Sequence, residues 1–95
     1  MNEVVTIEGA WSSEANAWVS ETIQLDGDCY LDVTLPDKGR LVVKKSENAD
    51  GPWPKALITK WSGQRFKVRL YGTTESRYIK VYLTEAPTII QISAV

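Results

Sequence analysis

The side chains that most often perform acid–base and metal chemistry are scarce in this sequence. Histidine, the commonest general base and transition-metal ligand, is absent from all 95 residues. The single cysteine, Cys29, therefore has no histidine to activate it as a nucleophile. No serine lies in a nucleophile-elbow pattern, and the six glycines are scattered singly, so the sequence contains no phosphate-cradling loop. We therefore expect a protein that is not an enzyme and that uses no cofactor.

Carboxylates are the remaining candidates for chemistry. A pair of them could cleave a glycoside, but most fall at expected turns or on wet strand faces, where solvated carboxylates are poor proton donors at neutral pH. Asp26, Asp28 and Asp32 in "DGDCYLD" could ligate Ca²⁺ through their oxygens. Their spacing is not that of a helix–loop–helix calcium loop, and a hairpin turn at Asp26-Gly27 also explains this segment. A hairpin turn is the favoured interpretation of this segment. A metal site formed by the three aspartates is the alternative.

Aromatic side chains offer binding rather than catalysis. Of the four tryptophans, Trp53 stands between Pro52 and Pro54, after the polar turn formers of "SENADG". The two prolines fix the backbone around it, so its side chain loses little further entropy on meeting a ligand. Two interpretations stay open. Trp53 is either a plug that closes the end of the hydrophobic core, or a contact offered to a sugar or a protein neighbour.

Basic residues alternate with aromatic ones in two segments. "RFKVRLY" places Arg65, Lys67 and Arg69 in one strand phase, with Tyr71 at its end, and "RYIKVYL" places Lys80 between two tyrosines, the first of them Tyr78. Single-stranded nucleic acid is bound on surfaces of this composition. A solvated sheet face whose cations prevent edge-to-edge pairing has the same pattern. The second interpretation is favoured because the rest of the chain is acidic.

The segments that must position these residues alternate with period 2, as strands with one wet face do. Four runs alternate most clearly, at residues 19–25, 29–35, 65–71 and 77–83, and noisier runs lie at 3–8, 40–45, 56–61 and 88–95. Their expected inward residues are Val19, Glu21, Ile23 and Leu25; Cys29, Leu31, Val33 and Leu35; Phe66, Val68 and Leu70; and Ile79, Val81 and Leu83.

Turn-forming residues separate these runs. Asp26-Gly27, residues 36–39 ("PDKG") and residues 62–64 ("SGQ") are predicted as hairpin turns, and residues 72–76 as a longer connection. A short helical turn would fit only in "GAWSSEANAW". The sequence therefore predicts one all-β domain over residues 1–95, a single antiparallel β-sandwich of about eight strands with a jelly-roll-like arrangement.

Charge is distributed unevenly between the two halves of the chain. Residues 1–48 hold nine acids and four bases, which gives −5, and residues 49–95 hold seven bases and three acids, which gives +4. Hairpins whose solvent-exposed faces carry different charges would explain this asymmetry. A molecule with one acidic and one basic half, which packs head to tail with copies of itself or with a charged neighbour, would explain it as well. Neither a secretory signal nor an apolar run of about 18–20 residues is present, so we expect no export by a cleaved signal and no membrane partner.

Residues 44–95 resemble the end of a discoidin-type, galactose-binding-like β-sandwich. The turn and the penultimate strand of that family are matched by Ser46, Asp50, Gly51 and Trp53, and by Arg77, Tyr78, Ile79 and Val81. In the family, the penultimate strand pairs with a final strand rich in isoleucine. The chain is shorter than a full family member and lacks the disulfide that many members carry. The resemblance implies a jelly roll with exposed end loops and a binding or structural role, and no ligand residue is carried over.

The short, cysteine-poor format also resembles the small auxiliary proteins that decorate bacteriophage capsids or build their fibres. We therefore expect a non-catalytic structural or interaction protein of a phage-like particle, located in the virion, or in the cytoplasm if it is not viral. Its expected partners are a capsid or fibre protein and copies of itself, while nucleic acid is disfavoured. The alternative is a carbohydrate-binding module that uses the loop tryptophans. The expected contact residues are Pro52, Trp53, Pro54, Arg65, Lys67, Arg69, Tyr71, Tyr78 and Lys80.

Overall fold

The computed structural model describes residues 4–53, 55–73 and 77–94, except for the side chains of residues 55, 57, 58 and 60–62. The described residues form eight strands and no helix, which confirms the all-β prediction. The strands are β1 (Val4–Thr6), β2 (Gly9–Ser12), β3 (Ala17–Ser20), β4 (Ile23–Gln24), β5 (Cys29–Ser46), β6 (Lys55–Leu70), β7 (Tyr78–Leu83) and β8 (Ile89–Ala94).

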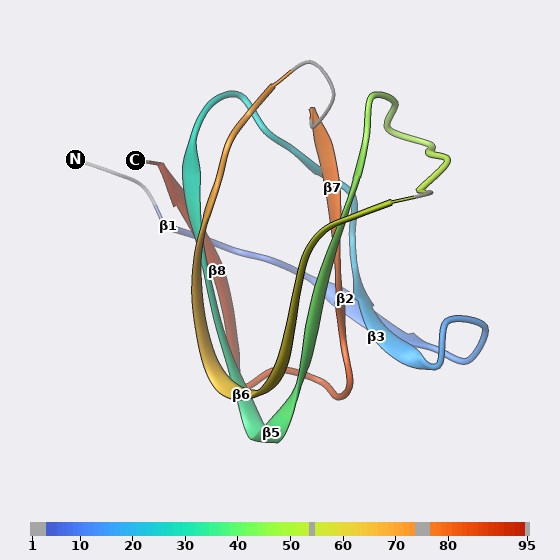
Figure 1. The fold of residues 1–95 in the computed structure, drawn as a ribbon, viewed down its shortest axis with the longest axis vertical. Helices are drawn as coiled ribbons and strands as arrows, with labels where there is room; N and C mark the ends of the chain where they lie inside the picture. Colours follow the sequence, from blue (N-terminus) through green and yellow to red (C-terminus); the bar gives the residue numbers. More distant parts are fainter. Residues whose placement is uncertain (1–3, 54, 74–76, 95) are drawn as a thin grey trace.

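The eight strands make one antiparallel sheet that curls into a half-barrel (Figure 1). Its frame is the long pair β5–β6, which is bent in the middle, so that each strand has two halves. We call the first half of β5, the second half of β6, β8 and β1 the first arm. The second arm contains the second half of β5, the first half of β6, β7, β3, β2 and β4.

The hydrophobic core fills the concave side of this curled sheet. Leu31 and Val33 of the first arm and Leu41 and Val43 of the second arm are at most 1% exposed and belong to one cluster. Each such side chain contributes about 1.5–3 kcal/mol by leaving water. The same cluster contains Cys29, Leu35, Ile79, Val81 and Leu83. The inward residues predicted for 29–35 and 77–83 are therefore confirmed.

The turns predicted at residues 36–39 and 62–64 are wrong. Both segments lie inside continuous strands, and β5 pairs with β6 from Cys29 opposite Leu70 to Lys45 opposite Lys55. The register shifts on either side of Gly39, as it does where a bulge bends a strand pair. A Cβ at Gly39 would collide with Oγ1 of Thr84, so the bend packs closely against the connection between β7 and β8. The predicted turns are the shared corner of two long strands.

The segment predicted as a helical turn is a β-hairpin. Strand β2 pairs with β3, and Trp11 lies directly opposite Trp18. Asn16 has a φ of 52°, which asparagine tolerates better than most residues, and the Ser12 hydroxyl accepts a hydrogen bond of 3.2 Å from the Ala15 N–H. Trp18 belongs to the core, whereas Trp11 is 54% exposed.

Residues 19–25 form two short strands instead of the one predicted. In β3, Trp18 and Ser20 are buried while Val19 is half-buried and Glu21 beyond it is exposed, so the predicted phase is wrong here. Strand β4 pairs with β7 and not with β5. Asp26-Gly27 is therefore a bend that carries the chain from the second arm to the first, and not the predicted hairpin turn.

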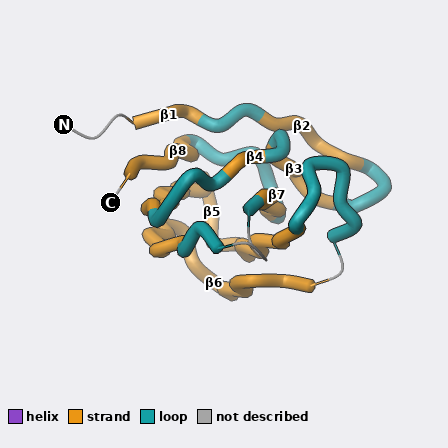
Figure 2. Tube along the Cα trace, turned by 90° about the horizontal axis from the view of Figure 1, so that it is seen from above, coloured by secondary structure: helices purple, strands orange, loops and turns teal. Residues whose placement is uncertain are grey.

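The short segment that joins β1 to β2 links the first arm to the second, and a backbone hydrogen bond anchors it at each end. The Ile7 N–H donates to the Ile90 carbonyl in the first arm, at 3.1 Å, and the Glu21 N–H donates to the Glu8 carbonyl beside the second arm, at 2.9 Å. Seen from above, β1 and β2 run along one side of the molecule and β6 along the opposite side (Figure 2). Strands β7 and β8 both pair with β5 and not with each other, unlike the pairing that the discoidin resemblance implies.

Candidate binding surfaces

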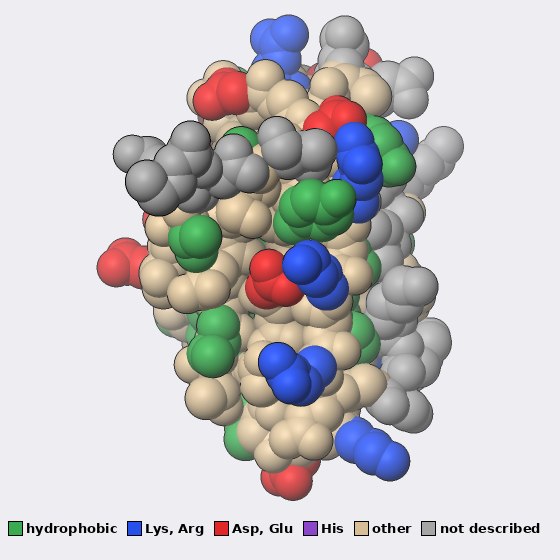
Figure 3. Space-filling model, turned by 90° about the vertical axis from the view of Figure 1, so that its left-hand side faces the viewer, with side chains coloured by type: hydrophobic (Ala, Val, Ile, Leu, Met, Phe, Trp, Pro, Cys, Tyr) green, Lys and Arg blue, Asp and Glu red, His purple; other side chains and the backbone are tan. Residues whose placement is uncertain are grey.

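The outer surface of the first arm carries the first of the two predicted basic rows. Because Val68 and Leu70 point into the core, the alternating residues Arg65, Lys67 and Arg69 point outward and are exposed. Their neighbours across the β5–β6 pair are Thr34, Asp32 and Tyr30. We call this surface the basic face: Arg65, Lys67, Arg69, Tyr71, Tyr30, Asp28 and Asp32. Figure 3 views the molecule from this side, where basic, acidic and hydrophobic side chains lie close together.

Contacts between neighbouring side chains order the basic face. The Lys67 ammonium lies 5.3 Å from the centre of the Tyr30 ring, and the Arg69 guanidinium lies 5.9 Å from Tyr30 and 5.3 Å from Tyr71. Arg69 also donates a hydrogen bond of 3.3 Å to the Asp28 carboxylate, which raises the pKa of Arg69. Each cation–π contact at an exposed site is worth about 0.5–1 kcal/mol. The basic face is thus partly ordered before any partner arrives.

A hollow of about 390 Å³ lies in the basic face. Its polar walls come from three neighbouring strands: Asp32 and Thr34 on β5, Arg65 and Lys67 on β6, and Gln91 on β8. Ile89, which is 47% exposed, adds an apolar wall. The hollow therefore offers charged hydrogen-bond donors from β6 and neutral donors from β5 and β8, beside the apolar Ile89.

The loop that contains Trp53 lies against the second arm. Trp53 is half-buried, does not belong to the core cluster, and has the Lys80 ammonium 5.4 Å from its ring centre. Gly51 has a φ of 84°, which turns the chain back so that a Cβ there would meet the Trp53 ring. Trp53 is therefore neither a plug in the core nor a fully exposed contact. It lies on the outer surface of the second arm, with its ring against the ammonium group of Lys80.

The predicted contact residues divide between the two arms. Arg65, Lys67, Arg69 and Tyr71 belong to the first arm, whereas Trp53, Tyr78 and Lys80 belong to the outer surface of the second. The bend of β5 separates these groups, so one platform holding Arg65, Lys67, Arg69 and Lys80 is not formed. Pro52 is exposed beside Trp53, and Pro54 lies outside the described residues.

The candidate calcium ligands do not come together. Asp28 accepts the hydrogen bond from Arg69, and Asp32 lies opposite Lys67 in the sheet. Asp26 lies at the bend between β4 and β5 and lines a different cavity. No group of three or more acidic or cysteine residues that could hold a metal occurs in the described part of the chain. The described structure therefore makes "DGD" a bend between two strands, and it does not gather Asp26, Asp28 and Asp32 into one site.

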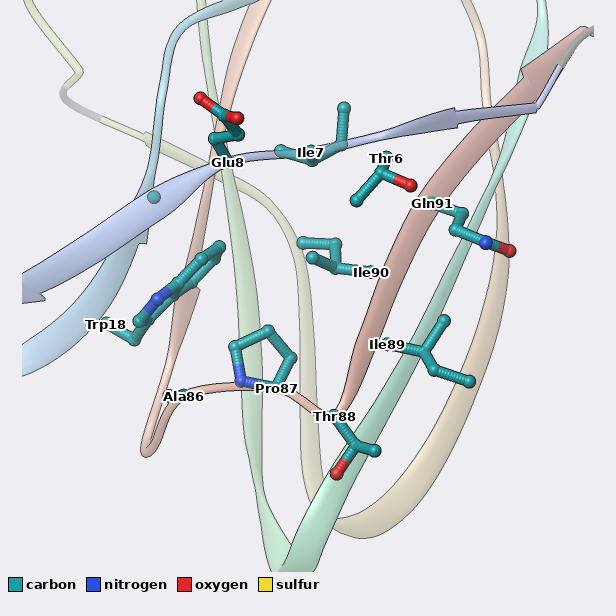
Figure 4. Close-up of a pocket in the computed structure, with 11 residues that line it drawn as sticks. Thr6, Ile7, Glu8, Trp18, Ala86, Pro87, Thr88, Ile89, Ile90 and Gln91 are labelled. Carbon is teal, nitrogen blue, oxygen red and sulfur yellow. The ribbon is translucent and has the colours of Figure 1, made fainter.

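A cavity lies between the start of β8 and the segment that links β1 to β2 (Figure 4). It measures about 480 Å³, and Trp18, Ile7, Pro87 and Ile90 give it apolar walls. Glu8 is the only titratable side chain among its lining residues.

Cys29 lines a second cavity, of about 430 Å³. Its side chain is 7% exposed, and burial together with the nearby charge of Asp28 raises the pKa of the thiol. The thiol form is therefore retained at neutral pH, where only the thiolate would be a good nucleophile. This agrees with the prediction of a buried small hydrophobic residue at position 29.

Sequence reasoning missed two residues of these surfaces. Tyr30 contacts both Lys67 and Arg69, and Lys44 lies 4.7 Å from the centre of the Tyr82 ring on the second arm. The alternation of "CYLDVTL" already places Tyr30 on a wet face, but its partners depend on the pairing of β5 with β6. Lys44 is found only when the register of β5 with β7 is known.

Known proteins give no further assignment of these surfaces. No protein-family model, curated protein or solved structure matches the chain. Within the described ranges, no helix has the length and hydropathy needed to cross a bilayer.

Proposed function

We propose that this chain is a non-catalytic interaction protein that docks on another protein through the basic face. The observation that carries the proposal is the contact of Lys67 and Arg69 with Tyr30 and of Arg69 with Tyr71. Tyrosine and arginine are enriched among the residues that dominate binding energy at protein interfaces. Here they stand on a sheet with their positions partly fixed, which lowers the entropy lost on docking.

The charge balance of the basic face favours a protein over a nucleic acid. Its three cations are accompanied by Asp28, which is bonded to Arg69, and by Asp32, which lies opposite Lys67. A nucleic-acid surface would present uncompensated cations to a row of phosphates. Mixed charges with tyrosines and the exposed Ile89 suit a protein surface of complementary pattern.

An auxiliary protein of a phage-like particle remains the proposed setting, with a capsid or fibre protein and copies of the chain as partners. It rests on the short format and on the opposite net charges of the two halves of the sequence, −5 and +4. A virion location and a jelly-roll-like sandwich of discoidin type are parts of the same prediction. Particles purified from the native source, probed with an antibody against the chain, would test the setting.

Capture of partners from the native source tests the basic face itself. The tagged chain is compared with the double variant Arg65→Ala, Tyr71→Ala, whose side chains are exposed and do not belong to the core cluster. The variant Asp37→Ala, Lys38→Ala, at the exposed corner of β5, is the matched control. We expect the purified partner to bind the first variant at least about tenfold more weakly and the control normally. Equal binding by all three chains would reject the basic face.

A carbohydrate-binding role is the second candidate, and the half-exposed Trp53 favours it. The loop presents Trp53 near Tyr78 and Lys80 on one surface, and aromatic rings of this kind stack on sugars. The Lys80 ammonium already occupies one face of the ring, so a sugar would use the other face or displace the lysine. A glycan array with wild-type and Trp53→Ala chains tests this role, and no signal that depends on Trp53 would retire it.

A further inference from the structure

We infer that the outer surface of the second arm contains a site for an oxyanion group, a sulfate or a phosphate, between Lys44 and Lys80. This inference concerns the opposite arm from the basic face. It does not depend on the protein-docking function proposed above.

The two lysines are direct neighbours across the sheet. Lys44 of β5 lies opposite Lys80 of β7 in the register, and the residues that flank them, Val43 and Val81, are fully buried. Both lysines therefore project from the outer surface, with Cβ atoms about 4.5–5.5 Å apart, as in any directly opposed pair. Like charges placed directly opposite each other destabilise a sheet. Such an arrangement calls for a compensating anion.

The described part of the chain does not supply that anion. No described carboxylate lies within 4.0 Å of either ammonium group, and the contacts of the two lysines are with aromatic rings. Lys44 lies 4.7 Å from the centre of the Tyr82 ring, and Lys80 lies 5.4 Å from that of Trp53. These rings attract the cations without neutralising them, so each ammonium keeps hydrogen-bond donors for a ligand.

The neighbours of the pair include a small residue on one side and a further donor on the other. On the side of β6, the neighbour of Lys44 is Ala56, an exposed small residue. On the side of β7, Tyr82 is half-buried, and burial raises the pKa of its hydroxyl, which therefore stays a donor. A tetrahedral oxyanion has enough oxygens to accept hydrogen bonds from two ammonium groups at once. A doubly charged group also matches the two positive charges of the pair.

Titration with inorganic ions tests the site directly. The full chain is followed by NMR while sodium sulfate or sodium phosphate replaces sodium chloride at constant ionic strength. We expect saturable shifts of the Lys44, Lys80, Tyr82 and Trp53 signals with either oxyanion. Glucose 6-sulfate and glucose 6-phosphate, compared with glucose, then separate a free ion from a sugar-borne group. Tighter binding of the sugar esters assigns the group to a saccharide, and equal binding assigns the site to the oxyanion alone.

Matched variants decide whether the lysine pair is responsible. Lys44→Gln and Lys80→Gln should each raise the dissociation constant at least about tenfold, since each removes a charged donor. Lys38→Gln, at the exposed corner of β5, removes the same charge and should leave the constant unchanged. Thermal unfolding of each variant checks that it is folded. Shifts that rise linearly without saturation, or an equal loss in Lys38→Gln, would overturn the inference.

Discussion

The backbone N–H of Val81 donates a hydrogen bond of 2.8 Å to the hydroxyl of Ser20, which lies 61 positions earlier in the chain. Strand β3 pairs with β7 through Trp18 opposite Leu83 and Val19 opposite Tyr82, and it ends at Ser20. The Ser20 side chain thus supplies the next hydrogen bond to β7 after the backbone pairing of β3 with β7 has ended. The same hydroxyl donates to the Glu21 carbonyl at 2.8 Å, so both of its hydrogen-bonding roles are used.

Replacing Ser20 with alanine should destabilise the fold by about 1–3 kcal/mol, because the buried N–H of Val81 would lose its acceptor. Chemical unfolding of the two proteins measures the difference. Ser12→Ala is the matched control, since the Ser12 hydroxyl accepts one exposed hydrogen bond from Ala15. We expect the control to change stability much less. Equal losses of unfolding free energy in both variants would show that the hydrogen bond between Val81 and Ser20 stabilises the fold no more than an exposed one.

Gly39 and Gly27 should respond in opposite ways to the same substitution. A Cβ at Gly39 would collide with Oγ1 of Thr84, which is held in place by accepting a hydrogen bond of 3.1 Å from the Arg40 N–H. At Gly27, nothing lies within 4 Å of the added carbon, and its φ is not in the left-handed region.

Gly39→Ala should therefore cost about 1–3 kcal/mol, as overpacking does elsewhere, while Gly27→Ala should be neutral within about 0.5 kcal/mol or slightly stabilising. Thermal and urea unfolding of the two variants provide the measurement. A neutral Gly39→Ala would mean that the corner of β5 is not packed as tightly against Thr84 as the structure has it.

The corner at Gly39 also shows what sequence reasoning could and could not predict. The alternation of residues 29–35 and 77–83 fixes which side chains enter the core, because the period of 2 is a local property of a strand. "PDKG" has the composition of a turn, yet here it bends a strand that continues to Ser46. Turn and bend use the same residues, and only pairing with β6 along its whole length distinguishes them. Ser20 is not among the inward residues expected for 19–25, and its buried contact is with Val81, which is distant in the chain.

For the candidate surfaces, too, local alternation was predictable from the sequence and strand pairing was not. The outward phase of Arg65, Lys67 and Arg69 was predictable from "RFKVRLY" alone, and the structure agrees. Their separation from Lys80 and the pairing of Lys80 with Lys44 depend on which half of β5 each strand joins. That is a property of topology, which a single sequence does not encode locally.

Cys29 should make the fold sensitive to alkaline pH. Burial raises the pKa of its thiol above the ordinary value of 9.0 in the folded chain. The unfolded chain therefore loses its thiol proton first as the pH rises, and stability falls from about pH 9 until the raised pKa is reached. Urea unfolding of wild-type and Cys29→Ala chains across this range measures the effect. The variant should lose less stability over the interval, and parallel curves would contradict a raised thiol pKa.

The long edge of β6 leads to the last prediction. In the described residues, β6 pairs with β5 and with no other strand, so one edge of its 16 residues is open. Open edges invite pairing with another chain, and charged side chains oppose it. Arg65→Thr with Lys67→Thr keeps strand-compatible residues but removes two cations from this edge, so we expect larger species in sedimentation velocity. Lys38→Thr with Lys80→Thr changes the net charge equally away from the edge and should behave like the wild type. If both double variants form larger species, net charge rather than the position of Arg65 and Lys67 on β6 limits self-association. If neither does, these two cations do not protect the edge.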